Sequence, residues 1–326
     1  PWAVFYPQSD TPWSGICYTL CLVAFILNAF DVELLTNLLR IVYIGSRGPL
    51  SVIPLAKLLG AGQSLCAIGV DTDDTARPRA DRIPVTIEDQ GSVEFLAGRH
   101  GIPLIRLQGA WSASVDEIAE YMPHIILVSC FARRLPDVVL SIPSMGCFNL
   151  HPSLLPAYRG PLPLFWQFRD GCREFGVTLH HMTSRLDAGD IVGQTRLVMP
   201  DGVSGRQASV LLAEAGGDLL VDAVSALGHG KAAAIPQNER AASYQGYPVP
   251  GDYAVSANWS ARRLYNFVCA TRDHGLRYPC DVGGRLYWLS DVLSWQQATA
   301  PEPRISGDTL TIPCNPGSVV ARMETA

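Results

Sequence analysis

Lysine is almost missing from this chain of 326 residues, which contains only Lys57 and Lys231. Arginine supplies the other basic side chains, and we attribute this bias to codon usage rather than to function. The formal net charge of -5 at pH 7 argues against a general attraction to nucleic acid.

Paired cysteines are also lacking. The nine cysteines include no CxxC pair and no His/Cys spacing typical of a zinc site. Scattered cysteines of this kind are typical of a reducing compartment. We therefore expect free thiols, no bound metal and a cytoplasmic location.

A membrane-length apolar run is not evident either. The charge-free run from Ile16 to Phe30 has 15 residues, which is short for a membrane span. Residues 1–38 contain no Lys or Arg, so the basic region of a signal peptide is missing. Three interpretations stay open: a membrane or export signal, an extra docked helix, or an extension upstream of the functional fold. We favour the extension and expect no membrane association.

What is present suits about two packed domains, because 48% of the residues are hydrophobic. Strand patterns at 39–44, 64–70, 102–107 and 124–129 alternate with helix patterns at 49–59, 91–100 and 114–122. This alternation predicts a Rossmann-like, doubly wound, mostly parallel α/β sheet. The first glycine turn reads G-x-x-G rather than G-x-G-x-x-G, which disfavours a nicotinamide oxidoreductase.

Residues 147–192 are the most informative stretch. A short buried strand begins at Cys147 and ends at His151, so Asn149 and His151 point to the same side of it. Open α/β sheets bind ligands at the carboxyl ends of such strands. A second strand, 177–182, leads to a turn from which Asp187 can reach His151 and fix its tautomer. An amide, an imidazole and a carboxylate together can serve as oxyanion donor, general base and orienting group.

The order of these residues adds a resemblance. The runs N-L-H-P-S-L-L-P-A-Y-R-G, G-V-T-L-H-x-M and L-D-A-G-D-I resemble motifs of the 10-formyltetrahydrofolate-dependent formyltransferases. The resemblance implies that Asn149, His151 and Asp187 are catalytic, and that 10-formyltetrahydrofolate is the co-substrate. It also implies that the folate contacts the S-L-L-P turn and the loop after strand 124–129. The residues so implied are Ser153, Leu154, Leu155, Pro156, Phe131, Arg134 and Leu135.

Other polar residues near these motifs have two interpretations. Arg159 either holds an anionic part of a substrate or pairs with an acid. Arg133 either serves the folate loop or points into solvent. His180 and His181 are adjacent in a strand, so at most one faces the site, and we expect both to be structural.

The rest of the chain divides as follows. Residues 1–38 are the extension, 39–228 the formyltransferase catalytic domain, 229–251 a linker and 252–326 a C-terminal domain. We expect Gly216 and Gly217 to weaken or bend the long helix predicted at 204–227. The run N-W-S-A-x-x-L resembles the helix that opens the OB-like domain of methionyl-tRNA formyltransferases. Strand patterns at 285–289, 292–295, 309–313 and 318–322 predict a small OB-like β-barrel. Because the chain ends early, a barrel that lacks its last strands is a second possibility.

The alternative functions differ mainly in the amine that accepts the formyl group. The two-domain layout favours initiator methionyl-tRNA, but residues 244–326 carry seven acids and seven arginines, and acids also outnumber bases in 71–90. An amino-sugar nucleotide or another small amine therefore stays open. A 10-formyltetrahydrofolate hydrolase is disfavoured because 1–38 is too short for the regulatory domain that such enzymes carry. A non-catalytic folate-binding module is disfavoured by the complete trio.

Overall fold

The computed structural model describes residues 39–71, 92–109 and 111–324. The predictions about the 1–38 extension and the charged 71–90 loop lie almost entirely outside these residues. No helix within the described ranges is long and apolar enough to cross a membrane.

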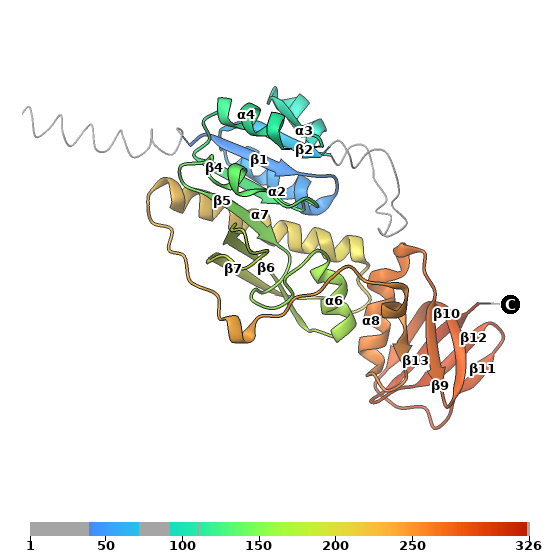
Figure 1. The fold of residues 1–326 in the computed structure, drawn as a ribbon. Coiled ribbons are helices and arrows are strands. Elements are labelled where there is room, and N and C mark those ends of the chain that lie inside the picture. Colours follow the sequence, from blue (N-terminus) through green and yellow to red (C-terminus); the bar gives the residue numbers. More distant parts are fainter. Residues whose placement is uncertain (1–38, 72–91, 110, 325–326) are drawn as a thin grey trace, which may run out of the picture.

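The first domain alternates strands and helices (Figure 1). Its elements are β1 (Ile41–Gly45), α2 (Pro49–Gly60), β2 (Leu65–Asp71), α3 (Val93–His100), β3 (Leu104–Leu107), α4 (Ser112–Glu120), β4 (Ile125–Ser129), α5 (Asp137–Leu140), β5 (Cys147–His151), α6 (Pro163–Asp170), β6 (Glu174–His181), β7 (Ile191–Val198) and α7 (Gly205–Gly228). The sheet order is β3-β2-β1-β4-β5-β6-β7. Strands β1 to β5 pair in parallel, whereas β6 and β7 are antiparallel.

Both faces of this sheet are buried. In β1, Ile41 and Tyr43 join a core built with α2, α3 and α7, whereas Val42 and Ile44 join one built with α4 and α5. Alternate residues of a strand point to opposite faces, so helices cover the sheet on both sides. The predicted Rossmann-like, mostly parallel α/β sheet is confirmed.

Helix α7 is one unbroken helix of 24 residues, so the predicted weakening at its glycine pair needs correction. A Cβ atom at Gly216 would lie 2.9 Å from Leu150 Cδ2, and one at Gly217 would lie 2.6 Å from Lys57 Cδ. The glycines therefore allow α7 to pack closely on β5 and α2, and this packing offsets their poor helix propensity.

The second domain contains β8 (Val255–Ser256), α8 (Ala261–Thr271), β9 (Tyr278–Val282), β10 (Arg285–Gln296), β11 (Arg304–Ser306), β12 (Thr309–Pro313) and β13 (Ser318–Met323). Its described strand pairs run in the order β11-β12-β13-β10-β9-β8, without a pair joining the two end strands. The two strands predicted at 285–289 and 292–295 are parts of the single strand β10, which pairs with β9 through 285–289 and with β13 through 289–296. Irregularities in register interrupt the pairing with β13 between Leu289 and Asp291 and between Val292 and Ser294. Strands β8, β9 and β11 were not predicted.

The two domains share one aromatic core. The Phe165 ring of α6 lies 5.3 Å from the Phe267 ring of α8 and 5.1 Å from that of Tyr253. Figure 1 shows α6 and α8 side by side at the domain boundary. The connecting residues include the 3-10 turns Glu239–Ala241 and Pro250–Tyr253, and they follow the β7 edge, where Ile235 bridges to Ile191. This connection therefore lies on the first domain rather than behaving as a free linker.

Candidate active site

The carboxyl end of β5 presents the first two residues of the site. Asn149 and His151 lie on one face of the strand, as their spacing predicts. Strand β6 runs antiparallel beside it, with His180 opposite Asn149 and Thr178 opposite His151. Side chains directly opposite each other on neighbouring strands share a face. An amide and two imidazole groups therefore lie in the same region.

Asp187 joins them from the turn after β6. Its Oδ1 atom lies 3.4 Å from Asn149 Nδ2, and its Oδ2 atom lies 3.7 Å from His151 Nδ1. The backbone N–H of Gly160 donates to Oδ2 over 2.9 Å. Asp187 has a φ of 50°, a conformation uncommon outside glycine, and its side chain is only 7% exposed. The structure thus brings together the three residues predicted to be catalytic.

The tautomer of His151 is set by a backbone carbonyl. His151 Nε2 lies 2.8 Å from the carbonyl oxygen of Tyr158, which can only accept a hydrogen bond, so Nε2 carries the proton. The 3.7 Å contact with Asp187 is longer than a hydrogen bond. The expectation that Asp187 fixes the tautomer therefore needs correction. In the neutral ring, Nδ1 is the nitrogen that can accept a proton.

The buried surroundings of His151 and Asp187 determine the charge that each carries. Burial lowers the pKa of His151 below its ordinary value, although the neighbouring Asp187 charge opposes the shift. Burial alone would raise the pKa of Asp187, but His151, His180 and the Gly160 N–H together lower it to about 2. At neutral pH the site therefore holds a neutral imidazole beside an ionised carboxylate.

His180 is a site residue that the sequence did not reveal. Its Nδ1 lies 2.7 Å from the His181 carbonyl oxygen, so Nδ1 carries the proton and Nε2 accepts. That Nε2 lies 3.3 Å from Asn149 Nδ2 and 3.6 Å from Asp187 Oδ1. His180 therefore orients the Asn149 amide. His181 faces the other way, with its ring 4.4 Å from that of Phe148.

The predicted folate residues of the S-L-L-P turn differ in their accessibility. Ser153 and Leu155 are buried, and the Ser153 hydroxyl donates to the Ala157 carbonyl over 2.8 Å. Leu154 and Pro156 are half-buried. Only these two side chains of the turn retain surface through which a ligand can be touched.

The predicted loop after β4 divides in the same way. Leu135 is 2% exposed and belongs to the core beneath the sheet, whereas Phe131 is half-buried. Arg134 is exposed and donates to the Ser184 carbonyl. Arg133 does not simply point into solvent, because its guanidinium donates to the carbonyls of Leu107 and Gly109.

Arg159 has the second of its two expected roles. Its guanidinium donates to Glu239 Oε1 over 3.0 Å and to Gln237 Oε1 over 2.8 Å. The side chain is 8% exposed. Arg159 therefore pairs with an acid of the connecting segment.

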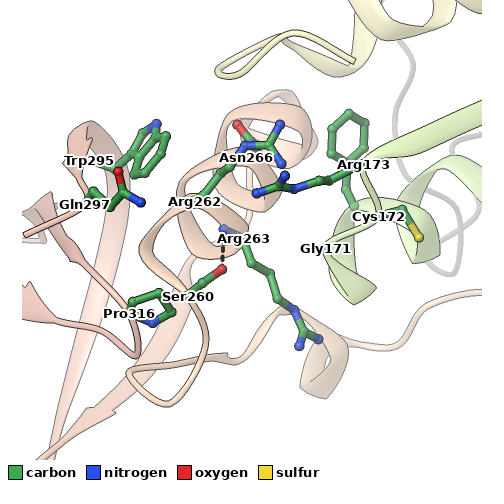
Figure 2. A pocket seen from close by; sticks show the side chains of 11 residues that line it. Gly171, Cys172, Arg173, Ser260, Arg262, Arg263, Asn266, Trp295, Gln297 and Pro316 are labelled. Atoms are coloured by element: carbon green, nitrogen blue, oxygen red, sulfur yellow. Dashed lines mark hydrogen bonds between the residues drawn. The ribbon is translucent and has the colours of Figure 1, made fainter. Parts of the chain in front are cut away.

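A cavity of about 150 Å³ lies elsewhere, between α6 and α8 (Figure 2). Figure 2 shows Arg173 and Arg262 entering it from the two domains. Asn149, His151 and Asp187 do not line it. The candidate site is located by the convergence of buried polar side chains, not by this cavity.

Solved structures of known proteins share this fold. An N-formyltransferase from Helicobacter canadensis, in complex with folinic acid and dTDP-3-aminofucose, is 16% identical; the match covers 88% of this chain and 100% of that one, with a TM-score of 0.65. WlaRD, a sugar 3N-formyltransferase in the presence of dTDP and 5-N-formyl-THF, is 15% identical over 88% of this chain and 98% of its own, with a TM-score of 0.62. HypX from Aquifex aeolicus, in complex with tetrahydrofolic acid, is 18% identical over 86% of this chain but 43% of its own, with a TM-score of 0.55.

Residues 88–224 match the family described as Formyl transferase. This range contains β5, β6 and the Asp187 turn, and with them the whole candidate site. The resemblance predicted from the sequence motifs is confirmed. The chain therefore carries a formyl transferase domain over these residues.

Proposed function

We propose that this enzyme transfers a formyl group from 10-formyltetrahydrofolate to the primary amine of an amino-sugar nucleotide. The similarity to two sugar N-formyltransferases carries the choice of acceptor, because this chain spans 100% and 98% of their lengths. The first was solved with folinic acid and dTDP-3-aminofucose, and the second with dTDP and 5-N-formyl-THF. Tetrahydrofolic acid in a HypX structure supports a folate co-substrate further.

The proposed chemistry begins with attack of the unprotonated amine on the formyl carbon. The carbonyl oxygen gains negative charge, and the Asn149 amide can donate to it in place of its long 3.4 Å contact with Asp187. One such donor in a dry site contributes about 3–4 kcal/mol to transition-state stabilisation. The other N–H group of the Asn149 amide is held by His180 Nε2.

The proton released by the amine goes to His151. Nδ1 is the open basic nitrogen, because the Tyr158 carbonyl engages Nε2–H. The imidazolium that forms lies 3.7 Å from the Asp187 carboxylate, which stabilises it. His151 then returns the proton to the folate nitrogen as its bond to the formyl carbon breaks. The products are a formamide and tetrahydrofolate, and no proton is gained or lost overall.

Methionyl-tRNA is the alternative acceptor. The two-domain layout favours it, since α8 begins directly after the Trp259-Ser260 pair that resembles the methionyl-tRNA enzymes. The balance of seven acids and seven arginines in 244–326 counts against it, because surfaces that bind tRNA carry excess positive charge.

A competition assay tests the proposal. The protein is incubated with 10-formyltetrahydrofolate and an equimolar mixture of a dTDP-amino sugar and methionyl-tRNA, and the formylated products are quantified by mass spectrometry. We expect a formylated amino sugar in excess. Formyl-methionyl-tRNA as the main product would replace the proposed acceptor, and formate released without either amine would indicate a hydrolase.

A further inference from the structure

One short stretch of the connecting segment contacts both loops that hold the trio. We call residues 237–245 the clamp. It touches the Asp187 turn through Gln237 and the Tyr158-Arg159-Gly160 loop through Ser243 and Gln245. It lies about 50 to 100 residues beyond the trio in sequence, yet it is in direct contact with the loops that support the trio.

Gln237 forms hydrogen bonds to two backbone carbonyls of the Asp187 turn. Its Nε2 donates to the Asp187 carbonyl over 2.9 Å and to the Gly189 carbonyl over 2.7 Å. Its Oε1 accepts two hydrogen bonds from Arg159. A glutamine amide has two N–H donors and an oxygen with two lone pairs, so every position is used. The Asp187 backbone is in the left-handed region, which an aspartate adopts only when its surroundings hold it there.

The other end of the clamp holds the loop that contacts His151. Ser243 Oγ accepts from the Tyr158 N–H over 2.8 Å, and the Ser243 carbonyl accepts from the Arg159 N–H over 2.9 Å. The Gln245 N–H donates to the Arg159 carbonyl over 2.8 Å. These bonds fix the carbonyl of Tyr158, which sets the His151 tautomer, and the Gly160 N–H, which binds Asp187.

We propose that Gln237 is a positioning residue for the transfer reaction, acting through the Asp187 backbone to keep the Asp187 carboxylate beside His151 and Asn149. The inference rests on the proposed function only for its kinetic readout. Gln237 itself touches no reacting atom.

The test uses Gln237→Met, which keeps the side-chain length and removes all four hydrogen bonds. The matched control is Arg240→Ala, an exposed side chain of the same clamp. We expect kcat to fall by about 100-fold in Gln237→Met with an unchanged KM for the folate, because misplacing a catalytic group by about 1 Å costs this much. Arg240→Ala should match the wild type.

The pH profile separates positioning from general loosening. Asp187 and His180 are the titratable groups beside His151, with Arg159, Arg185 and Glu239 in the next layer. Asp187 raises the pKa of His151, so moving Asp187 away should shift the acidic limb of kcat/KM to lower pH. Wild-type kcat in Gln237→Met, or a loss of kcat with an unmoved acidic limb, would overturn the proposal.

Hydrogen exchange gives a readout independent of activity. Backbone amides of residues 186–190 should exchange faster in Gln237→Met than in the wild type or Arg240→Ala, with the remaining domain unchanged. Unchanged exchange in this turn would overturn the clamp even in an active enzyme. A wild-type protein that formylates no amine would instead overturn the proposed function and leave the exchange result to stand.

Discussion

The carboxyl end of β5 and the core of the second domain are both buried, but they bury different chemistry. At the end of β5, the buried side chains of His151 and His180 both lie beside the buried Asp187 carboxylate. Arg159, which is also buried, lies in the neighbouring loop that bridges to Tyr244. In the described part of the second domain the buried polar side chains are Thr271 and Ser318, among aromatic and aliphatic residues. Burying ionisable groups costs free energy unless they are paired. The first region therefore concentrates buried ionisable side chains that contact one another, whereas the second is filled with aromatic and aliphatic side chains.

Removal of the His151 side chain should have the largest effect on the rate of formyl transfer. His151→Ala deletes the proposed base, and general acid–base catalysis contributes about 10²–10⁴-fold in rate. Formyl transfer measured by product mass spectrometry should fall by this factor while the circular dichroism spectrum stays the same. His229→Ala, which alters an exposed histidine, should leave the rate unchanged. Normal transfer by His151→Ala would remove this residue from the mechanism.

The second domain should respond in stability instead. Phe267 is fully buried against Phe165, and truncating such a ring costs about 3–5 kcal/mol of unfolding free energy. Denaturant titration of Phe267→Ala should show this loss, with kcat per folded molecule retained. Phe95→Ala, at an exposed position of α3, is the size-matched control and should lose far less. A Phe267→Ala protein of normal stability would contradict the shared core.

Replacement of Asn149 should distinguish transition-state stabilisation from substrate binding within the site. Asn149→Ala removes the proposed oxyanion donor, and the loss of such a donor typically costs about 10²–10³-fold in kcat. Because the effect is confined to the transition state, the KM for the folate should change little. Steady-state kinetics check this, with the exposed Asn258→Ala as control. A raised KM with an unchanged kcat would assign Asn149 to ground-state binding.

An exposed ion pair of the first domain provides the smallest expected effect. Arg196 and Glu174 are 3.1 Å apart, and their side chains are 66% and 65% exposed. Exposed pairs contribute about 0–1 kcal/mol, so Arg196→Ala should shift the unfolding free energy by less than about 1 kcal/mol and leave the rate unchanged. A large effect in either measurement would show that charge alone, without burial, matters in this domain.

The sequence predicted those features that depend on nearby residues. Asn149 and His151 could be placed because residues two apart in a strand point to the same face, and Asp187 because its turn follows the next strand. His180 could not be assigned, because its contact with Asn149 depends on the register between β5 and β6. Gln237 is farther still, and its side-chain contacts follow from the path of a segment that composition alone marks as a linker.

Local patterns also failed where tertiary contacts decide. Strand β11 has only three residues, all exposed, so it is too short to show a periodic pattern of apolar and polar side chains. Strand β9 contains Pro279, which argues against a strand when judged from sequence. The glycine pair of α7 predicts a weak helix by propensity, yet the neighbouring Leu150 and Lys57 need the space that glycine leaves.

The pH dependence of kcat/KM tests the central claim most directly, since that claim is a neutral, buried His151 beside an ionised Asp187. Burial lowers the pKa of His151 from 6.5, so the base should remain unprotonated, and the enzyme active, below that pH. Asp187→Asn removes a charge that raises this pKa, so its acidic limb should lie lower still, at a reduced rate. An acidic limb that Asp187→Asn leaves in place, or moves to higher pH, would contradict the assignment of His151 as the buried base.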